Sequence, residues 1–295
     1  MRSHEFLKLT SFCDNCMARA HTKNSVLSVF CARNSIFGDM ILVLDIGNSD
    51  ITMGLWDGTH WKHTWRIPSR THQPELFYGV KIRDYFFEAG IPVTSVSKMV
   101  LSSVVPGLTE KIHKVIRTLF EKEPVLLGPA VYEKLPIEVL NPYEIGSDLV
   151  ANSMGAYMKL KSTCIVADFG TALTFTTISS KGKILGVSIV PGLRTAIKAL
   201  SQNTAKLFDV PLETPTSALG KSTITAIQSG LVIGYDGLVR NIIGAIRKEL
   251  NEDCPAIATG GLSFVITSLK GFFASIEPNL TLDGLREIAE YQPLK

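Results

Sequence analysis

The chain has 295 residues, with 30 basic and 27 acidic side chains and a formal net charge of +3. This near balance gives no electrostatic reason to expect a nucleic-acid partner, and no apolar run approaches the roughly 20 residues that span a bilayer. The five cysteines are too few and too scattered for a disulfide framework. We therefore expect a cytoplasmic protein that binds neither nucleic acid nor membrane.

Residues 1–39 differ from the rest because they show no hydrophobic period. Cys13 and Cys16 have CxxC spacing, but no second pair of ligands follows to complete a four-ligand zinc site. The segment is also a poor signal peptide, since it lacks an apolar core and a small-residue cleavage pattern. We predict a disordered, dispensable extension that precedes a functional chain beginning at Met40.

The next 120 or so residues alternate apolar strand patterns with helical ones. A buried strand ends in Asp-Ile-Gly-Asn-Ser, and Asp57-Gly58 is typical of a hairpin turn. The expected strands are 40–45, 51–56, 61–67, 98–103 and 125–127. The expected helices are 75–89, 108–120 and 147–159.

The same order then begins again, with a strand that ends in Asp-Phe-Gly-Thr-Ala. The expected strands of this second part are 163–168, 173–179, 183–190 and 255–259. The expected helices are 194–206 and 223–250. The repetition predicts an α/β protein built from a duplicated β-β-β-α unit, with halves at 40–160 and 161–295.

An aspartate at the end of a strand, followed by glycine, suits phosphate and metal chemistry. Glycine lets the backbone approach phosphate oxygens, and a carboxylate is the kind of ligand that Mg²⁺ prefers. Asp45 with Gly47 could be a simple turn, but Asp168 with Gly170 repeats the pattern and Gly260-Gly261 ends a later strand. Together these turns predict a duplicated phosphate-binding site.

The segment 215–222 has the spacing of a P-loop, but Pro215 replaces the first glycine and no apolar strand precedes it. A P-loop needs a strand, a glycine-rich turn and a helix together, so we do not interpret this segment as one.

Six motifs, in a fixed order along the chain, together give a specific resemblance to a known family. They are Asp45-Ile-Gly-Asn-Ser, Asn141-Pro-Tyr-Glu-Ile-Gly-Ser-Asp148, Asp168-Phe-Gly-Thr-Ala-Leu-Thr, Pro191-Gly192-Leu, Gly220-Lys-Ser-Thr223 and Ala258-Thr-Gly-Gly261. Over about residues 40–291 the chain resembles the type III pantothenate kinases. The resemblance implies the duplicated ribonuclease H-like, two-domain fold of actin/hexokinase-like ATPases. It also implies a homodimer that phosphorylates pantothenate with ATP, Mg²⁺ and a monovalent cation (K⁺ or NH₄⁺), the first step towards coenzyme A.

The resemblance also assigns roles to residues. Asp148 matches the catalytic acceptor of the pantothenate hydroxyl proton, Asp168 a ligand of the monovalent cation, and Asp45 a candidate Mg²⁺ ligand. The residues assigned to ATP are Asp45, Ile46, Gly47, Asn48, Ser49, Asp50, Ile51, Thr52, Thr171, Gly260 and Gly261. The residues assigned to the substrate are Gly146, Ser147, Asp148, Leu149 and Thr223.

Three positions depart from the family pattern. Leu149 replaces an arginine that could hold the pantothenate carboxylate, Val139 replaces a substrate-binding tyrosine, and Thr176 replaces an aspartate. These changes leave two alternatives to pantothenate phosphorylation. One is a kinase of a related small molecule, and the other is a catalytically weakened, ATP-binding regulatory or accessory protein.

Overall fold

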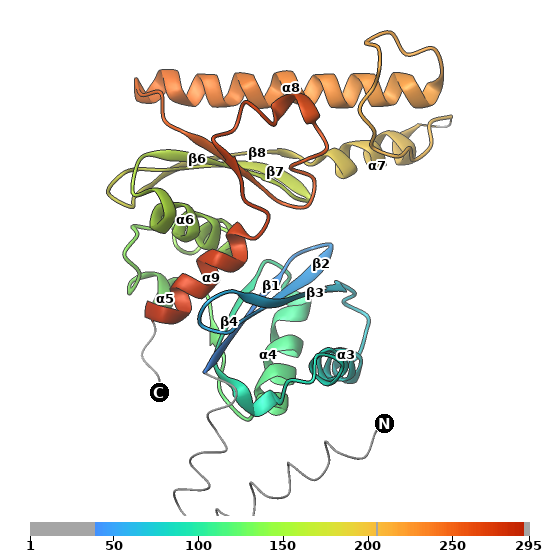
Figure 1. Ribbon diagram of the computed structural model, residues 1–295. Coiled ribbons are helices and arrows are strands. Elements are labelled where there is room, and N and C mark those ends of the chain that lie inside the picture. Colours follow the sequence, from blue (N-terminus) through green and yellow to red (C-terminus); the bar gives the residue numbers. More distant parts are fainter. Residues whose placement is uncertain (1–38, 205, 292–295) are drawn as a thin grey trace, which may run out of the picture. The chain divides into compact units, whose positions relative to one another are not determined.

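The computed structural model describes residues 39–204 and 206–291 (Figure 1), so the predictions for residues 1–38 fall outside the part that it describes. From Met40 onward the chain forms one compact unit. Its first sheet has the order β3-β2-β1-β4-β5, in which β1 pairs antiparallel with β2 and parallel with β4. The strands are β1 (Met40–Ile46), β2 (Asp50–Trp56), β3 (Trp61–Pro68), β4 (Val96–Ser103) and β5 (Val125–Leu126).

The second sheet repeats this plan, with the order β10-β9-β6-β7-β8. Its strand β6 pairs antiparallel with β7 and parallel with β9, as β1 pairs with β2 and β4. The strands are β6 (Cys164–Phe169), β7 (Ala172–Ile178), β8 (Ile184–Pro191), β9 (Ala256–Thr259) and β10 (Ser275–Ile276). The predicted duplication is confirmed, because equivalent strands have equivalent neighbours. The boundary at residue 160 between the halves stays a prediction.

Amphipathic helices cover the outer face of each sheet. On α4, the buried positions Leu108, Ile112 and Val115 recur at helical spacing and face inward. On α8, Val232 and Val239 belong to the core cluster that also contains residues of β6 and β7. These helices are α3 (Glu75–Glu88) and α4 (Pro106–Phe120) in the first half, and α7 (Leu193–Asn203) and α8 (Thr223–Leu250) in the second. The short elements are η1 (Val93–Ser95), α5 (Pro129–Tyr132) and η2 (Thr267–Leu269).

Within the described ranges 39–204 and 206–291, every helix is too short or too polar to cross a lipid bilayer.

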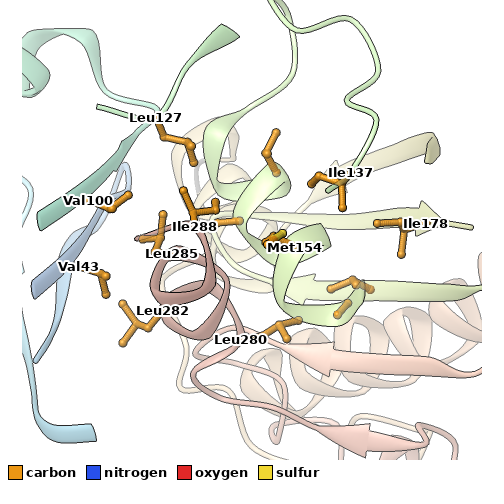
Figure 2. Close-up of a cluster of buried hydrophobic side chains, with 14 of the residues drawn as sticks. Val43, Val100, Leu127, Ile137, Met154, Ile178, Leu280, Leu282, Leu285 and Ile288 are labelled. Carbon is orange, nitrogen blue, oxygen red and sulfur yellow. The ribbon is translucent and has the colours of Figure 1, made fainter. Parts of the chain in front are cut away.

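Two helices, α6 (Ser147–Leu160) and α9 (Leu280–Tyr291), lie between the sheets (Figure 1). Figure 2 shows Leu282 and Leu285 of α9 facing Val43 and Val100 of the first sheet. Met154 of α6 belongs to the same buried cluster, which continues into the second sheet. The sequence analysis predicted α6 but no helix at residues 280–291. Helix α9 nevertheless joins the two halves of the core.

The helices α6 and α9 cross with their backbones in contact, because glycine occupies the crossing on both sides. A Cβ atom on Gly155 would lie 2.8 Å from the carbonyl oxygen of Leu280. A Cβ atom on Gly284 would overlap the carbonyl oxygen of Ala151. Any larger side chain at either position must separate the two helices.

We expect Gly284→Ala to lower the free energy of unfolding by roughly 1–3 kcal/mol, because the added methyl group overpacks a rigid backbone contact. The matched control is Gly79→Ala in α3, where the nearest atom to the new Cβ is 3.8 Å away and helix propensity favours alanine. Urea unfolding of both variants measures the difference. Equal stability of the two variants would contradict the close crossing.

Candidate active site

The first predicted phosphate turn connects β1 to β2. Asp45 precedes the turn, which closes where the Gly47 amide donates to the Asp50 carbonyl at 3.0 Å. The Ser69 hydroxyl donates to the Gly47 carbonyl at 2.6 Å and secures the turn against β3. One carboxylate oxygen of Asp45, Oδ1, is buried without a hydrogen-bond partner. Hydrogen bonds therefore hold the turn in place, while one carboxylate oxygen of the preceding Asp45 has no partner.

The second predicted phosphate turn connects β6 to β7 in the same way. The Gly170 amide donates to the Ala172 carbonyl at 3.0 Å. Gly260, at the end of β9, has φ of +88°, and a Cβ atom there would overlap Asp168 and lie 2.7 Å from the Phe169 amide nitrogen. Only glycine fits at residue 260, because both the conformation and the space exclude a side chain.

The two turns meet. The hydroxyl of Ser49 in the first turn is 3.0 Å from the hydroxyl of Thr171 in the second, although 122 residues separate them in sequence. Because both turns follow the carboxyl ends of central strands, their aspartates face the same region. Mutual repulsion between Asp45 and Asp168 also raises the pKa of Asp45. The duplicated fold thus brings together two motifs that the sequence placed far apart.

The amino-terminal end of α6 brings Asp148 to this region. The buried Ser147 hydroxyl donates to the Ser103 carbonyl at 3.1 Å and accepts from the Ser103 amide at 2.9 Å. It also lies 2.9 Å from the buried Ser102 hydroxyl. These bonds fasten the start of α6 to the carboxyl end of β4, beside Asp45. The Leu149 amide donates to Asp148 Oδ1 at 2.9 Å.

Burial is the largest influence on the pKa of each of the three carboxyl groups. Burial, followed by repulsion from Asp148, raises the pKa of Asp45 to about 7. Burial also raises the pKa of Asp168 to about 6, although the hydrogen bond from Asn152 lowers it. Burial raises the pKa of Asp148 as well. Three carboxyl groups with raised pKa values in one region favour a site that receives positive charge from a ligand.

The residues present fit bound cations. Asp45 offers an unpaired oxygen, and hard cations take oxygen ligands. Among the residues that the structure describes, no three His, Cys, Asp or Glu side chains converge closely enough to hold a metal by themselves. This pattern suits Mg²⁺, which often binds through one or two carboxylates and completes its coordination with the phosphates of a ligand.

The other predicted site residues vary in their surroundings. Ile46 and Ile51 have buried side chains, so only their backbones face the turn. Leu149 is buried, with 7% of its surface exposed. Thr223 begins α8 and lines a separate hollow of about 560 Å³ with Lys221, Leu200 and Ile227. No interaction within the described ranges joins Thr223 to the three aspartates.

Sequence analysis did not identify two polar residues behind the site. Asn152 is fully buried on α6, and its side-chain amide donates to Asp168 Oδ2 at 2.7 Å. The Thr281 hydroxyl of α9 donates to Asn152 Oδ1 at 2.7 Å. Asn152 follows Asp148 by one helical turn, a spacing that puts both on one face and could have indicated a shared site.

Comparison with known proteins finds relatives in one family. Residues 41–245 match the model of the type III pantothenate kinase family. A type III pantothenate kinase of Anaeromyxobacter sp. (strain K) is 37% identical over 251 residues, which cover 85% of this chain and 99% of the relative. Another from Thermomicrobium roseum is 38% identical over 252 residues, covering 85% and 97%.

Solved structures support the fold alone, since their sequences are distant. A Sinorhizobium meliloti protein assigned as a 2-dehydro-3-deoxygalactonokinase aligns with a TM-score of 0.54 at 10% identity, covering 85% of this chain and 96% of that one. A Campylobacter jejuni protein assigned to the Baf family of transcriptional activators aligns with a TM-score of 0.51 at 18% identity, covering 84% and 97%.

The repeated strand order and the two glycine turns that meet between the halves define a duplicated two-sheet α/β protein with an acidic site at their junction. The family match and the relatives go further. This chain belongs to the type III pantothenate kinase family.

The raised pKa values predict how stability depends on pH in the absence of ligand. An aspartate whose folded pKa exceeds its unfolded value near 3.8 binds more protons when folded, so stability falls as pH rises from the unfolded pKa through the folded one. For Asp45 this window runs from about pH 4 to about pH 7. Asp45→Asn should therefore stabilise the ligand-free protein at about pH 7.5, by roughly 2 kcal/mol, and much less at about pH 4.5.

Thermal unfolding of wild type and Asp45→Asn at the two pH values tests this expectation. Asp84→Asn, which makes the same change on the exposed face of α3, is the control and should leave the pH dependence unchanged. The raised pKa of Asp45 would be contradicted if the stability of wild type rose steadily up to about pH 7.5 and Asp45→Asn showed the same pH dependence.

Proposed function

We propose that this chain transfers the γ-phosphoryl group of ATP to the hydroxyl of pantothenate, forming 4′-phosphopantothenate on the way to coenzyme A. The observation that carries the proposal is the position of Asp148 beside the two phosphate turns, in a chain of the type III pantothenate kinase family. Phosphoryl transfer depends mainly on positioning and charge neutralisation, and this site offers groups for both.

We propose that the turns at 45–52 and 168–171 hold the phosphates of ATP through backbone amides, together with Gly260 and Gly261. Their glycines permit a close approach of the backbone. Asp45 would hold Mg²⁺ and Asp168 a monovalent cation. When bound, these ions neutralise charge on the phosphates and polarise the transferring group.

Asp148 is the proposed general base. As the pantothenate oxygen forms its bond to the γ-phosphorus, the bond from that phosphorus to the bridging oxygen of ADP breaks. The hydroxyl proton must leave at the same stage, and the Asp148 carboxylate accepts it. Burial favours this role, because a raised pKa makes the ionised group a stronger proton acceptor than an exposed aspartate.

We expect Asp148→Asn to lower kcat by about 10²–10⁴-fold while ATP affinity changes little, because the amide keeps the shape but accepts no proton. Steady-state kinetics with pantothenate and calorimetric ATP binding measure the two effects. Asp84→Asn again serves as the control for the same chemical change at the surface. Near wild-type turnover of Asp148→Asn would remove this residue as the base.

A kinase with a related, uncharged substrate is the second candidate, because two expected polar contacts are absent. Leu149 and Val139 have apolar side chains, so neither can form a charged contact or a hydrogen bond with the pantothenate carboxylate. We therefore expect kcat/KM for pantothenate and for its neutral amide analogue to agree within about tenfold, the effect of about 1.4 kcal/mol.

The Leu149→Arg variant tests the effect of restoring a contact to the pantothenate carboxylate. A guanidinium at residue 149 should lower the KM for pantothenate and leave that of the amide analogue unchanged. A wild-type enzyme that already prefers pantothenate by a hundredfold or more would show that another group holds the carboxylate. If wild type binds ATP but phosphorylates neither compound, the regulatory alternative gains support.

We also propose a homodimer formed through α8. Gly230, Ile233, Gly234 and Gly237 share one face of this helix, and all four are exposed. Small residues let a second helix approach closely, and Ile233 adds apolar area that is 46% exposed in the single chain. A cytoplasmic location stays a prediction from the sequence.

Sedimentation velocity at micromolar concentration should give a dimer for wild type and a monomer for Gly234→Arg, which puts a bulky charge on that face. A wild-type monomer would contradict the proposed interface. A dimeric Gly234→Arg protein would place the interface elsewhere.

A further inference from the structure

A chain of hydrogen bonds runs from the carboxyl-terminal helix to the second phosphate turn. The Thr281 hydroxyl of α9 donates to Asn152 Oδ1 at 2.7 Å, and Asn152 Nδ2 donates to Asp168 Oδ2 at 2.7 Å. Asn152 is fully buried, so water cannot replace either partner without entering the core. Three separate elements, α9, α6 and β6, thus meet at one side-chain amide.

The chain fixes which way the amide faces. An asparagine presents donors on one side and an acceptor on the other, and a flipped Asn152 would turn its oxygen towards the carboxylate of Asp168. The acceptor-only carboxylate of Asp168 requires the amino group on its own side, which leaves the amide oxygen towards α9, where the Thr281 hydroxyl donates to it and holds the amide in place. Thr281 therefore acts on Asp168 without touching it.

This arrangement gives the two oxygens of Asp168 different surroundings. Oδ2 is held by Asn152, whereas Oδ1 faces the glycines of the turns, where Gly260 has no room for a side chain and Gly170 would place a Cβ atom 3.7 Å away. No hydrogen bond within the described ranges involves Oδ1, so this oxygen keeps its capacity to accept a ligand. The amide on Oδ2 prevents the carboxylate from rotating away from that position.

The position of Thr281 depends on the close crossing of α6 and α9. Gly155 and Gly284 bring the helix backbones into contact, which sets the reach from Thr281 to Asn152. On its other side α9 is fastened to the first half, where the Trp61 indole nitrogen donates to Asp283 at 2.8 Å. The carboxyl-terminal helix thus links both halves to one carboxylate.

We propose that Asn152 and Thr281 are positioning residues that hold Asp168 Oδ1 ready for a monovalent cation, so that α9 sets the affinity of this site for K⁺. The inference rests on the proposed function only in taking Asp168 as the cation ligand. Loss of a residue that orients a metal ligand typically weakens metal affinity by about 10–100-fold.

The test compares Thr281→Val, which keeps the shape but lacks the hydroxyl, with Thr281→Ser, which keeps the hydroxyl. The first readout is the rise of the thermal midpoint with KCl, measured at constant ionic strength with choline chloride. The second is the KCl concentration for half-maximal kinase rate. We expect Thr281→Val to need about tenfold more KCl than wild type for the same rise in thermal midpoint and for half-maximal rate. Its kcat at saturating KCl should stay within about twofold of wild type. Thr281→Ser should match wild type.

Each result decides the inference. Equal KCl dependence of Thr281→Val and wild type overturns it, and so does a wild-type midpoint that does not respond to KCl. A wild type that makes no phosphopantothenate, but loses its KCl response in Thr281→Val, contradicts the proposed function and supports the inference. If Thr281→Val does not fold, Thr281→Ala removes the same hydroxyl without a branched methyl group and is judged by the same criteria.

Discussion

The loss of hydration at three neighbouring carboxyl groups constrains the rest of this structure. Asp45, Asp148 and Asp168 each lose hydration, and Asp148 raises the pKa of the other two. An uncompensated cluster of this kind destabilises a folded protein when its members ionise. The arrangement is consistent with a site that is completed by cations and phosphates, for which the glycine turns leave room.

Helix α6 explains how two separate sheets can share one site. Its first turn carries Asp148 and is bonded through Ser147 to the end of β4 in the first half. Its next turn carries Asn152, which is bonded to Asp168 of β6 in the second half. A rigid helix therefore sets the spacing between the proposed base and the proposed cation ligand. The buried α6–α9 crossing holds that helix between the sheets (Figure 2).

Much of the fold could be predicted from the sequence, because its signals are local. Apolar runs that end in Asp-x-Gly mark the central strands, and their repetition indicates the duplication, so the first three strands of each half and helix α8 were expected within a few residues. The motif pattern also identified the three aspartates. Their close approach depends on tertiary structure, which no local signal contains.

Helix α9 and its partners could not be predicted in the same way. Gly284 weakens the helical pattern of 280–291, yet it is required by the crossing with α6, so packing outweighs intrinsic propensity. Thr281 and Asn152 lack a motif of their own, and only the fold brings them together. The burial of Leu149 likewise depends on how α6 packs, which the sequence comparison could not reveal.

The most direct test of the account is the number of protons released when Mg²⁺-saturated ATP binds in the presence of KCl. Calorimetric titrations in two buffers of different ionisation enthalpy give this number. Because Asp45 and Asp168 have pKa values of about 7 and about 6, they are partly protonated in the free protein and must ionise to meet cations. The account predicts net proton release near pH 6.5 that disappears at about pH 8.5. Binding without proton release near pH 6.5, or with proton uptake, would contradict it.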